Sequence, residues 1–405
     1  MNLEETLGVN RAVIALSVAR LADAMGNSIL FIVLPLYVAQ MPAPWFPFPE
    51  PVRVGILISL FGLVSATFQP VMGAMSDRIG RRKVVIQAGL FLMGVATFCY
   101  LYAARFADLL VLRTIQGIGV ALTIPASMAI MAAVTSKKTR GGAMGVYTTL
   151  RMVGFASGPL VGGLLQVRYG FNAAFIAGTL LILLGMVLVQ MWVRDVRVET
   201  PTTDPRPFRM FEPSLMSSGI LGVGAATFVM ASAFSMMTTL ERQFNLKLNQ
   251  TALGFSVAFS ALMVSRLLFQ VPLGRLSDRI GRKPLIIGGL VLMAPATALL
   301  GEVVTTAQLT GLRLLQGLGG AAIAAPAFAL AGDLAKAGGE GRQMSIVTMG
   351  FGLGIAIGPL LAGLLAVHSF ELPFLVGGAM ALGGAWIVAR FVPETVGRKR
   401  KTAQA

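Results

Sequence analysis

The chain contains few of the residues on which most enzymatic chemistry depends. It has one cysteine, Cys99, and one histidine, His368, which excludes an internal disulfide and a histidine-based metal cluster. The GxxxxGKS/T loop that cradles ATP phosphates and the GxSxG nucleophile motif do not occur in the sequence. We therefore expect neither an ATPase nor a familiar hydrolase, and no cofactor or metal.

Charged residues are also scarce, at 12%, whereas hydrophobic residues make up 56% and the mean hydropathy is +0.78. A soluble domain is less apolar, at about 45–50%. Twelve apolar segments have about the length needed to cross a bilayer, which is roughly 20 residues. They are residues 12–40, 52–75, 84–104, 108–134, 142–166, 172–193, 216–240, 251–273, 284–302, 309–333, 344–367 and 372–391. The composition predicts an all-α polytopic membrane protein.

The net charge of +16 is distributed unevenly among the connectors. With the amino terminus placed in the cytoplasm, 22 lysines and arginines fall on the cytoplasmic side and five on the outer side. This asymmetry follows the positive-inside rule. We therefore expect a multi-pass protein of the plasma membrane or bacterial inner membrane with both termini in the cytoplasm, and no nucleic-acid partner.

An eleven-residue stretch occurs twice, as GAMSDRIGRRK from Gly73 and as GRLSDRIGRKP from Gly274. The offset of 201 residues divides the chain into two tandem halves. We expect a six-helix bundle over 1–193, a cytoplasmic linker over 194–215, and a second bundle with a basic tail over 216–405. The repeated residues form a candidate cytoplasmic gate: Gly73, Asp77, Arg78, Gly80, Arg81 and Arg82, with Gly274, Asp278, Arg279, Gly281 and Arg282.

A glycine-rich pattern in the fifth span is the second motif. It consists of Gly145, Gly154, Gly158, Pro159, Gly162 and Gly163. Small residues in this spacing allow a neighbouring helix to approach closely, so a generic packing helix is one interpretation.

These two motifs resemble those of the major facilitator superfamily. The repeated stretch resembles its signature loop, and the glycine pattern resembles its drug:proton antiporter branch. The resemblance implies two pseudo-symmetric six-helix bundles that rock around a substrate held near the bilayer midplane. We further expect Asp77 to lie against the start of the eleventh span, near Gln343 and Met344, and Asp278 against the start of the fifth, near Gly142 and Ala143. These contacts would latch the two halves together on the cytoplasmic side and favour the outward-open state.

The fourth span contains Arg113, and the second half repeats it as Arg313. The resemblance associates this arginine with proton transfer. Because both halves keep it, hydrogen bonding to neighbouring helices is an equally open interpretation.

Arg20 and Asp23 are three residues apart in the first span and share one helix face. Acids inside a span are costly and usually line a polar pathway. Asp23 is therefore a candidate proton-coupling site, together with Arg20 and Arg113. A structural ion pair between helices is the alternative. The connector 241–249 is expected to form an outer loop.

Arg151 and Arg266 lie inside the fifth and eighth spans, where the other half has Phe351 and Ser65. A symmetric scaffold needs the same residue in both halves. Arginines that only one half has are therefore candidates for binding the substrate. The expected substrate cavity contains Arg20, Asp23, Arg151 and Arg266.

We therefore expect a monomeric secondary transporter that exports a small lipophilic compound in exchange for protons. Guanidinium groups bind carboxylate or phosphate, which favours a neutral or anionic amphiphile over a cation. One alternative in the same fold is a transporter or flippase of an anionic lipid or organic acid. An alternative from a different class is a membrane receptor or scaffold that does not transport.

Overall fold

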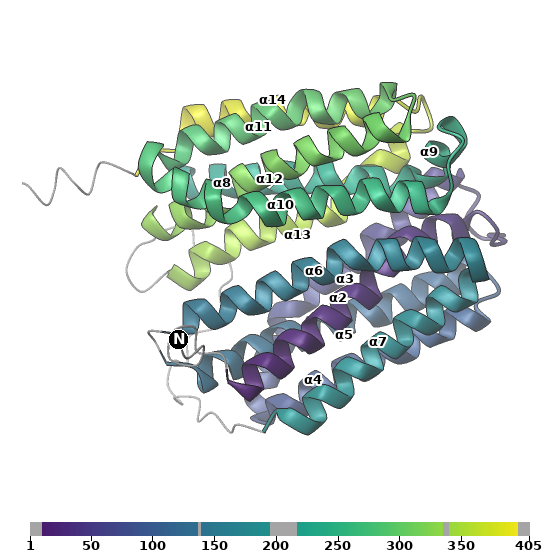
Figure 1. Ribbon diagram of the computed structural model, residues 1–405, viewed down its shortest axis with the longest axis horizontal. Coiled ribbons are helices and arrows are strands. Elements are labelled where there is room, and N and C mark those ends of the chain that lie inside the picture. Colours follow the sequence, from purple (N-terminus) through teal and green to yellow (C-terminus); the bar gives the residue numbers. More distant parts are fainter. Residues whose placement is uncertain (1–9, 137–138, 195–216, 335–339, 396–405) are drawn as a thin grey trace, which may run out of the picture. The chain divides into compact units, whose positions relative to one another are not determined.

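The computed structural model describes residues 10–136, 139–194, 217–334 and 340–395 (Figure 1). Within these ranges the chain is built of helices joined by short connectors. Twelve of the described helical segments are long and apolar enough to cross a membrane, which confirms the expected fold class. The expected linker, apart from Arg194, and the basic tail beyond residue 395 lie outside the described ranges.

The chain folds into two compact units, which we call the first and second units. The first comprises Met1–Phe48, Leu60–Thr203 and Thr251–Ser260. The second comprises Pro49–Ser59, Asp204–Gln250 and Ala261–Ala405. Each unit therefore takes most of its helices from one half of the sequence, and the first turns of one helix from the other half.

The helices of the amino-terminal half are α2 (Arg11–Val38), α3 (Glu50–Ile79), α4 (Arg82–Cys99), the short 3-10 turn η1 (Tyr100–Tyr102), α5 (Phe106–Val134), α6 (Arg140–Tyr169) and α7 (Phe171–Trp192). Those of the carboxy-terminal half are α8 (Ser218–Ser235), η3 (Met236–Leu240), α9 (Glu241–Lys247), α10 (Ala252–Ile280), α11 (Arg282–Ala298), η4 (Leu299–Glu302), α12 (Thr306–Leu334), α13 (Glu340–Leu365) and α14 (Leu372–Phe391).

Helix α2 lies at the centre of the first unit, packed along α6 and α7 (Figure 1). It begins after Asn10, whose side-chain oxygen accepts a hydrogen bond from the Val13 amide at 2.9 Å, as an amino-terminal cap does. Glycines on α6 permit the close approach. A Cβ atom added at Gly154 would lie 2.5 Å from the Leu21 carbonyl oxygen of α2. The polypeptide backbones of the two helices are therefore nearly in contact.

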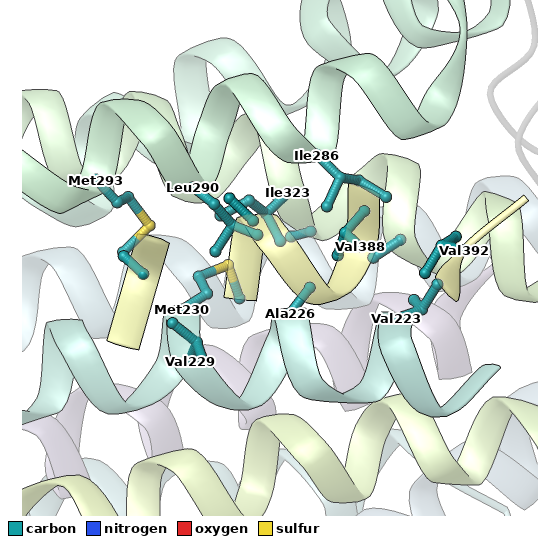
Figure 2. Packing of buried hydrophobic residues seen from close by; sticks show 14 of the residues in the cluster. Val223, Ala226, Val229, Met230, Ile286, Leu290, Met293, Ile323, Val388 and Val392 are labelled. Carbon is teal, nitrogen blue, oxygen red and sulfur yellow. The ribbon is translucent and has the colours of Figure 1, made fainter. Parts of the chain in front are cut away.

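The second unit repeats this packing with α8 against α13. Its apolar core draws on α8, α11, α12 and α14, and Figure 2 shows it filled by branched aliphatic side chains and methionines. Fully buried members include Met230, Leu290, Ile323 and Val388, each at most 1% exposed. Burying side chains of this size contributes roughly 1.5–3 kcal/mol each where the reference state is water.

The repeated eleven-residue stretch, which resembles a signature loop, is mostly helical in the structure. Its first part forms the last turns of α3 and of α10, and its last part begins α4 and α11. Gly80 and Gly281 make the sharp turn between each helix pair with positive φ angles of 66° and 112°, which disfavour residues with a side chain. This geometry explains why glycine recurs at both positions.

Candidate functional site

Three of the buried polar side chains of α2, those of Arg20, Asp23 and Asn27, interact with one another. The Arg20 guanidinium forms an ion pair with the Asp23 carboxylate. Asn27 donates a hydrogen bond from Nδ2 to the other carboxylate oxygen, Oδ1, at 2.8 Å. Residues three and four apart share a helix face, so the sequence spacing produces this cluster directly. The Asp23 carboxylate is therefore held by the positive charge of Arg20 and by the side-chain amide of Asn27.

A small cavity of about 10 Å³ adjoins the ion pair inside the first unit. Besides Arg20 and Asp23, three polar side chains line it: Thr123 of α5, Ser127 of α5 and Tyr147 of α6. The apolar lining residues are Leu16, Ala19, Ile86, Leu90 and Val189. A space of this volume with several polar partners suits roughly one water molecule. Sequence reasoning did not find the three hydroxyl side chains, because a lone Thr, Ser or Tyr in a span carries no distinguishing pattern.

The two units can be aligned through a shared contact of α2 and α8. Ser28 donates a hydrogen bond to the Gly154 carbonyl oxygen at 3.2 Å, and Ser235 donates one to the Gly354 carbonyl oxygen at 3.3 Å. These serines are 207 residues apart, whereas the glycines are 200 apart. An offset of 207 residues therefore relates α2 to α8, and an offset of 200 residues relates α6 to α13.

With this alignment, each polar residue of the cavity has a less polar counterpart in the second unit. Asp23 corresponds to Met230, Arg20 to Thr227, and Tyr147 to Val347. At the 200-residue offset Thr123 and Ser127 correspond to Ile323 and Ala327, while Ile86 and Leu90 correspond to Ile286 and Leu290. Most of these counterparts belong to the apolar core in Figure 2. The same place in the repeated fold is thus apolar in one unit and polar in the other.

The arginines of the fourth and tenth spans behave differently, since both units build the same network around them. Arg113 donates to the Gln116 side chain at 3.2 Å, and Gln116 donates to the Thr97 hydroxyl at 2.8 Å. In the second unit Arg313 donates to Gln316 at 2.7 Å, and Gln316 donates to Thr297 at 2.8 Å. This repetition favours a structural role for Arg113, and its part in proton coupling remains a prediction.

Arg151 and Arg266 each lie over an aromatic ring. The Arg151 guanidinium carbon lies 5.2 Å from the Phe155 ring centre, and its charge acts on the Asp23 carboxylate of the same unit. The Arg266 guanidinium carbon lies 5.4 Å from the Phe351 ring centre in the second unit. Because the two arginines belong to different units, their sharing of one cavity remains a prediction.

At the candidate gate, the structure describes the second copy in most detail. Arg282 forms ion pairs with Asp278, at 3.3 Å, and with Asp333. The Lys283 amide donates to the Glu394 carboxylate at 2.9 Å. The Asp77 side chain lies outside the described part of the chain, and the expected partner helices belong to the opposite units. The latch therefore stays a prediction.

The glycine pattern of α6 faces two neighbours within the first unit. Gly154, Gly158 and Gly162 lie against α2, and Gly163 lies against the first turn of α10, at Ala252 and Ser256. Gly145 differs, since a Cβ atom added there would have nothing within 4 Å. Four of the five motif glycines thus lie in close-packed parts of the helix, and Pro159 lies inside it.

Glu241 corrects one expectation. The segment 241–249 was expected as an outer loop, but α9 (Glu241–Lys247) continues the seventh span, and the Glu241 side chain is fully buried. Hydropathy places a span end where charges begin, and Glu241 and Arg242 occur together there. Arg242 forms an ion pair with Glu50.

Twelve apolar spans in two units of repeated architecture, with a buried ion pair in one of them, define a polytopic membrane protein of the transporter type. The sequence profile of the Major Facilitator Superfamily matches residues 16–264 and 219–405. The chain belongs to this family.

Two curated proteins are similar to this chain in sequence, and two solved structures are similar in fold. An uncharacterized MFS-type transporter of Methanocaldococcus jannaschii is 24% identical over 78% of this chain and 82% of its own length. The multidrug resistance protein MdtG of Escherichia coli O9:H4 is 26% identical over 87% of each chain. A bacterial homologue of the human lysosomal transporter Spinster, in an inward-facing and occupied conformation, has a TM-score of 0.76 at 14% identity, with 94% of this chain and 96% of that chain covered. The human organic anion transporter MFSD10 has a TM-score of 0.69 at 20% identity, with 93% and 99% covered.

Proposed function

We propose that the protein is a proton-coupled exporter of small lipophilic compounds, with both termini in the cytoplasm, and that Asp23 is its proton-coupling site. The observation that carries the proposal is the difference between the units. A packing role for Arg20 and Asp23 would call for similar residues in both units, yet the second unit has Thr227 and Met230 there and fills the surrounding space with apolar side chains. The polar cavity is therefore a specialised addition to the shared scaffold.

The residues around Asp23 fit a site that takes up and releases a proton. Arg20 and Asn27 stabilise the carboxylate when it is ionised. A water molecule in the adjoining cavity would give the proton a partner near the Thr123, Ser127 and Tyr147 hydroxyls. Any movement that separates Arg20 from Asp23 changes the proton affinity of the carboxylate, because an opposite charge within about 4–6 Å favours the ionised form. Coupling requires such a change between two conformations.

Similarity supports export as the direction of transport. The glycine pattern of α6 resembles that of drug:proton antiporters, and the related protein in Escherichia coli is named a multidrug resistance protein. Alternating access then moves the compound outward as protons move inward. In this cycle the residues of the repeated eleven-residue stretch act as the cytoplasmic gate.

The test is transport by the purified protein in liposomes with an imposed pH gradient. Three pyrene probes of similar size cover the charge classes: pyrenebutyrate, pyrenebutanol and pyrenebutyl-trimethylammonium. We expect at least one to be concentrated by the wild type under the gradient, and Asp23→Asn to abolish that accumulation because the amide cannot take up a proton.

The matched control is Asp108→Asn. Asp108 caps α5 in the same unit by accepting hydrogen bonds from two backbone amides at 2.9 Å, a role that an asparagine oxygen also fulfils. This variant should transport as the wild type does. Gradient-driven accumulation that survives Asp23→Asn, or that no probe shows in the wild type, would contradict the proposal.

A further inference from the structure

Five arginines of the described spans lie at least seven residues from either end of their helix, and four of these have an evident role in the fold or in the proton site. Arg20 pairs with Asp23, and Arg151 acts on the same carboxylate. Arg113 and Arg313 are fully buried and hydrogen-bonded to the glutamines of the repeated network. The fifth, Arg266, belongs neither to the site around Asp23 nor to the repeated glutamine networks.

Arg266 lies near the middle of α10, fourteen residues from each end of the helix Ala252–Ile280. At 1.5 Å per residue this is about 21 Å from either end, close to the centre of a bilayer. Its side chain is half-buried, and Nε is buried without a hydrogen bond. Within the described ranges no carboxylate lies within ion-pair distance of its guanidinium, and its one identified interaction is with the Phe351 ring.

The surroundings of Arg266 are apolar and aromatic. Phe351 of α13 has Phe234 of α8 as its neighbour, with 6.0 Å between ring centres. Gly320 of α12 leaves room beside the arginine, since a Cβ atom added there would lie 4.0 Å from the Arg266 Cδ atom and 3.8 Å from the Met230 sulfur. Figure 2 shows Met230 on α8, among the side chains of the apolar core.

A charge at this depth is costly unless something neutralises it. The Phe351 ring compensates part of the charge through its negative face. The scaffold does not require the arginine, because the first half has Ser65 at the equivalent position. A bound anion would complete the coordination of a guanidinium that remains partly accessible.

We propose that Arg266 binds the anionic head of the transported compound, while the neighbouring rings of Phe351 and Phe234 hold its apolar body. The substrate class is then an amphiphile with a carboxylate or phosphate group, and organic cations are disfavoured. This inference rests on the proposed export function and adds the sign of the substrate. Guanidinium groups bind both anion types in a fork geometry, so the head group is defined by its charge.

The test is equilibrium binding to the full-length protein in nanodiscs of neutral lipid, without a pH gradient. Fluorescence anisotropy of pyrenebutyrate, pyrenebutyl phosphate and pyrenebutyl-trimethylammonium compares two anions and one cation on the same fluorophore. We expect at least one anion to bind the wild type more tightly than the cation. Arg266→Gln should weaken that anion roughly 10- to 100-fold, and Arg266→Lys should weaken it less, because the lysine keeps the charge but loses the fork.

Arg390→Gln is the matched control. Arg390 also lies over an aromatic ring of the second unit, 5.8 Å from the Phe391 ring centre, but it is exposed at the end of α14. This variant should bind the anions as the wild type does. Thermal unfolding of each variant shows whether a loss of binding reflects a loss of folded protein.

Several outcomes would overturn the inference: equal or tighter binding of the cation, no binding of either anion by the wild type, or unchanged anion binding by folded Arg266→Gln. The inference and the proposed function fail separately. Proton-driven export of the cation that survives Arg266→Gln refutes the anion site and leaves proton coupling intact. Anion binding that depends on Arg266, in a protein without gradient-driven transport, supports the site and refutes the coupling.

Discussion

The ion pair in α2 can be tested by exchanging it for the residues that the second unit has at the same place. The substitutions are Arg20→Thr and Asp23→Met, singly and together, because Thr227 and Met230 are the counterparts. The two charged residues are 8% and 2% exposed, so each single change leaves one charge buried without its partner. Removing one member of a buried pair costs about 3–5 kcal/mol.

The double variant removes both charges and supplies an apolar side chain next to Leu16, Ala19 and Leu90. Removing both partners together leaves neither charge buried alone, which avoids the penalty of an unpaired buried charge. We therefore expect the free energy of unfolding of the double variant to lie above that of either single variant, and proton-driven transport to be absent from all three. The asparagine Asn27, which donates to Asp23, stays in place throughout.

The assay is equilibrium unfolding in mixed micelles by increasing mole fractions of dodecyl sulfate, followed by tryptophan fluorescence and circular dichroism. The three variants and the wild type form a double-mutant cycle, which isolates the interaction between the two side chains. Single-variant losses that add in the double variant to within about 0.5 kcal/mol would show that the residues are not coupled, and would refute the pair as described.

The remaining predictions concern helix packing and the gate. Gly158→Ala should lower the free energy of unfolding by about 1–3 kcal/mol, because its Cβ would lie 2.5 Å from the Met25 carbonyl oxygen, whereas Gly145→Ala has free space and should not. Unfolding of the two variants side by side checks this, and equal losses would contradict it. Combined Asp77→Asn and Asp278→Asn should increase thiol labelling of single-cysteine reporters from the cytoplasmic side, because the latch that favours the outward-open state is lost. An unchanged labelling pattern would refute the latch.

The sequence was sufficient for the architecture. Length and hydropathy along the chain predicted twelve spans, and the structure confirms this number among the described residues. Two motifs and a 201-residue repeat indicated the family to which the chain belongs. These features are local or periodic, so they can be read without knowing which helices are neighbours. The pairing of Arg20 with Asp23 was equally accessible, because residues three apart on a helix share a face.

Only the tertiary structure showed what surrounds that pair. The spans are apolar on nearly all sides, so the pattern of hydrophobic residues does not tell which face of a helix meets another helix and which meets lipid. Tyr147 lies more than 120 positions along the chain from Asp23, and packing between helices brings both to one cavity. The same packing places Arg113 and Arg313 in matching networks and leaves Arg266 beside an aromatic ring. A residue's role in this protein depends on its neighbours on other helices, and those are decided by three-dimensional packing.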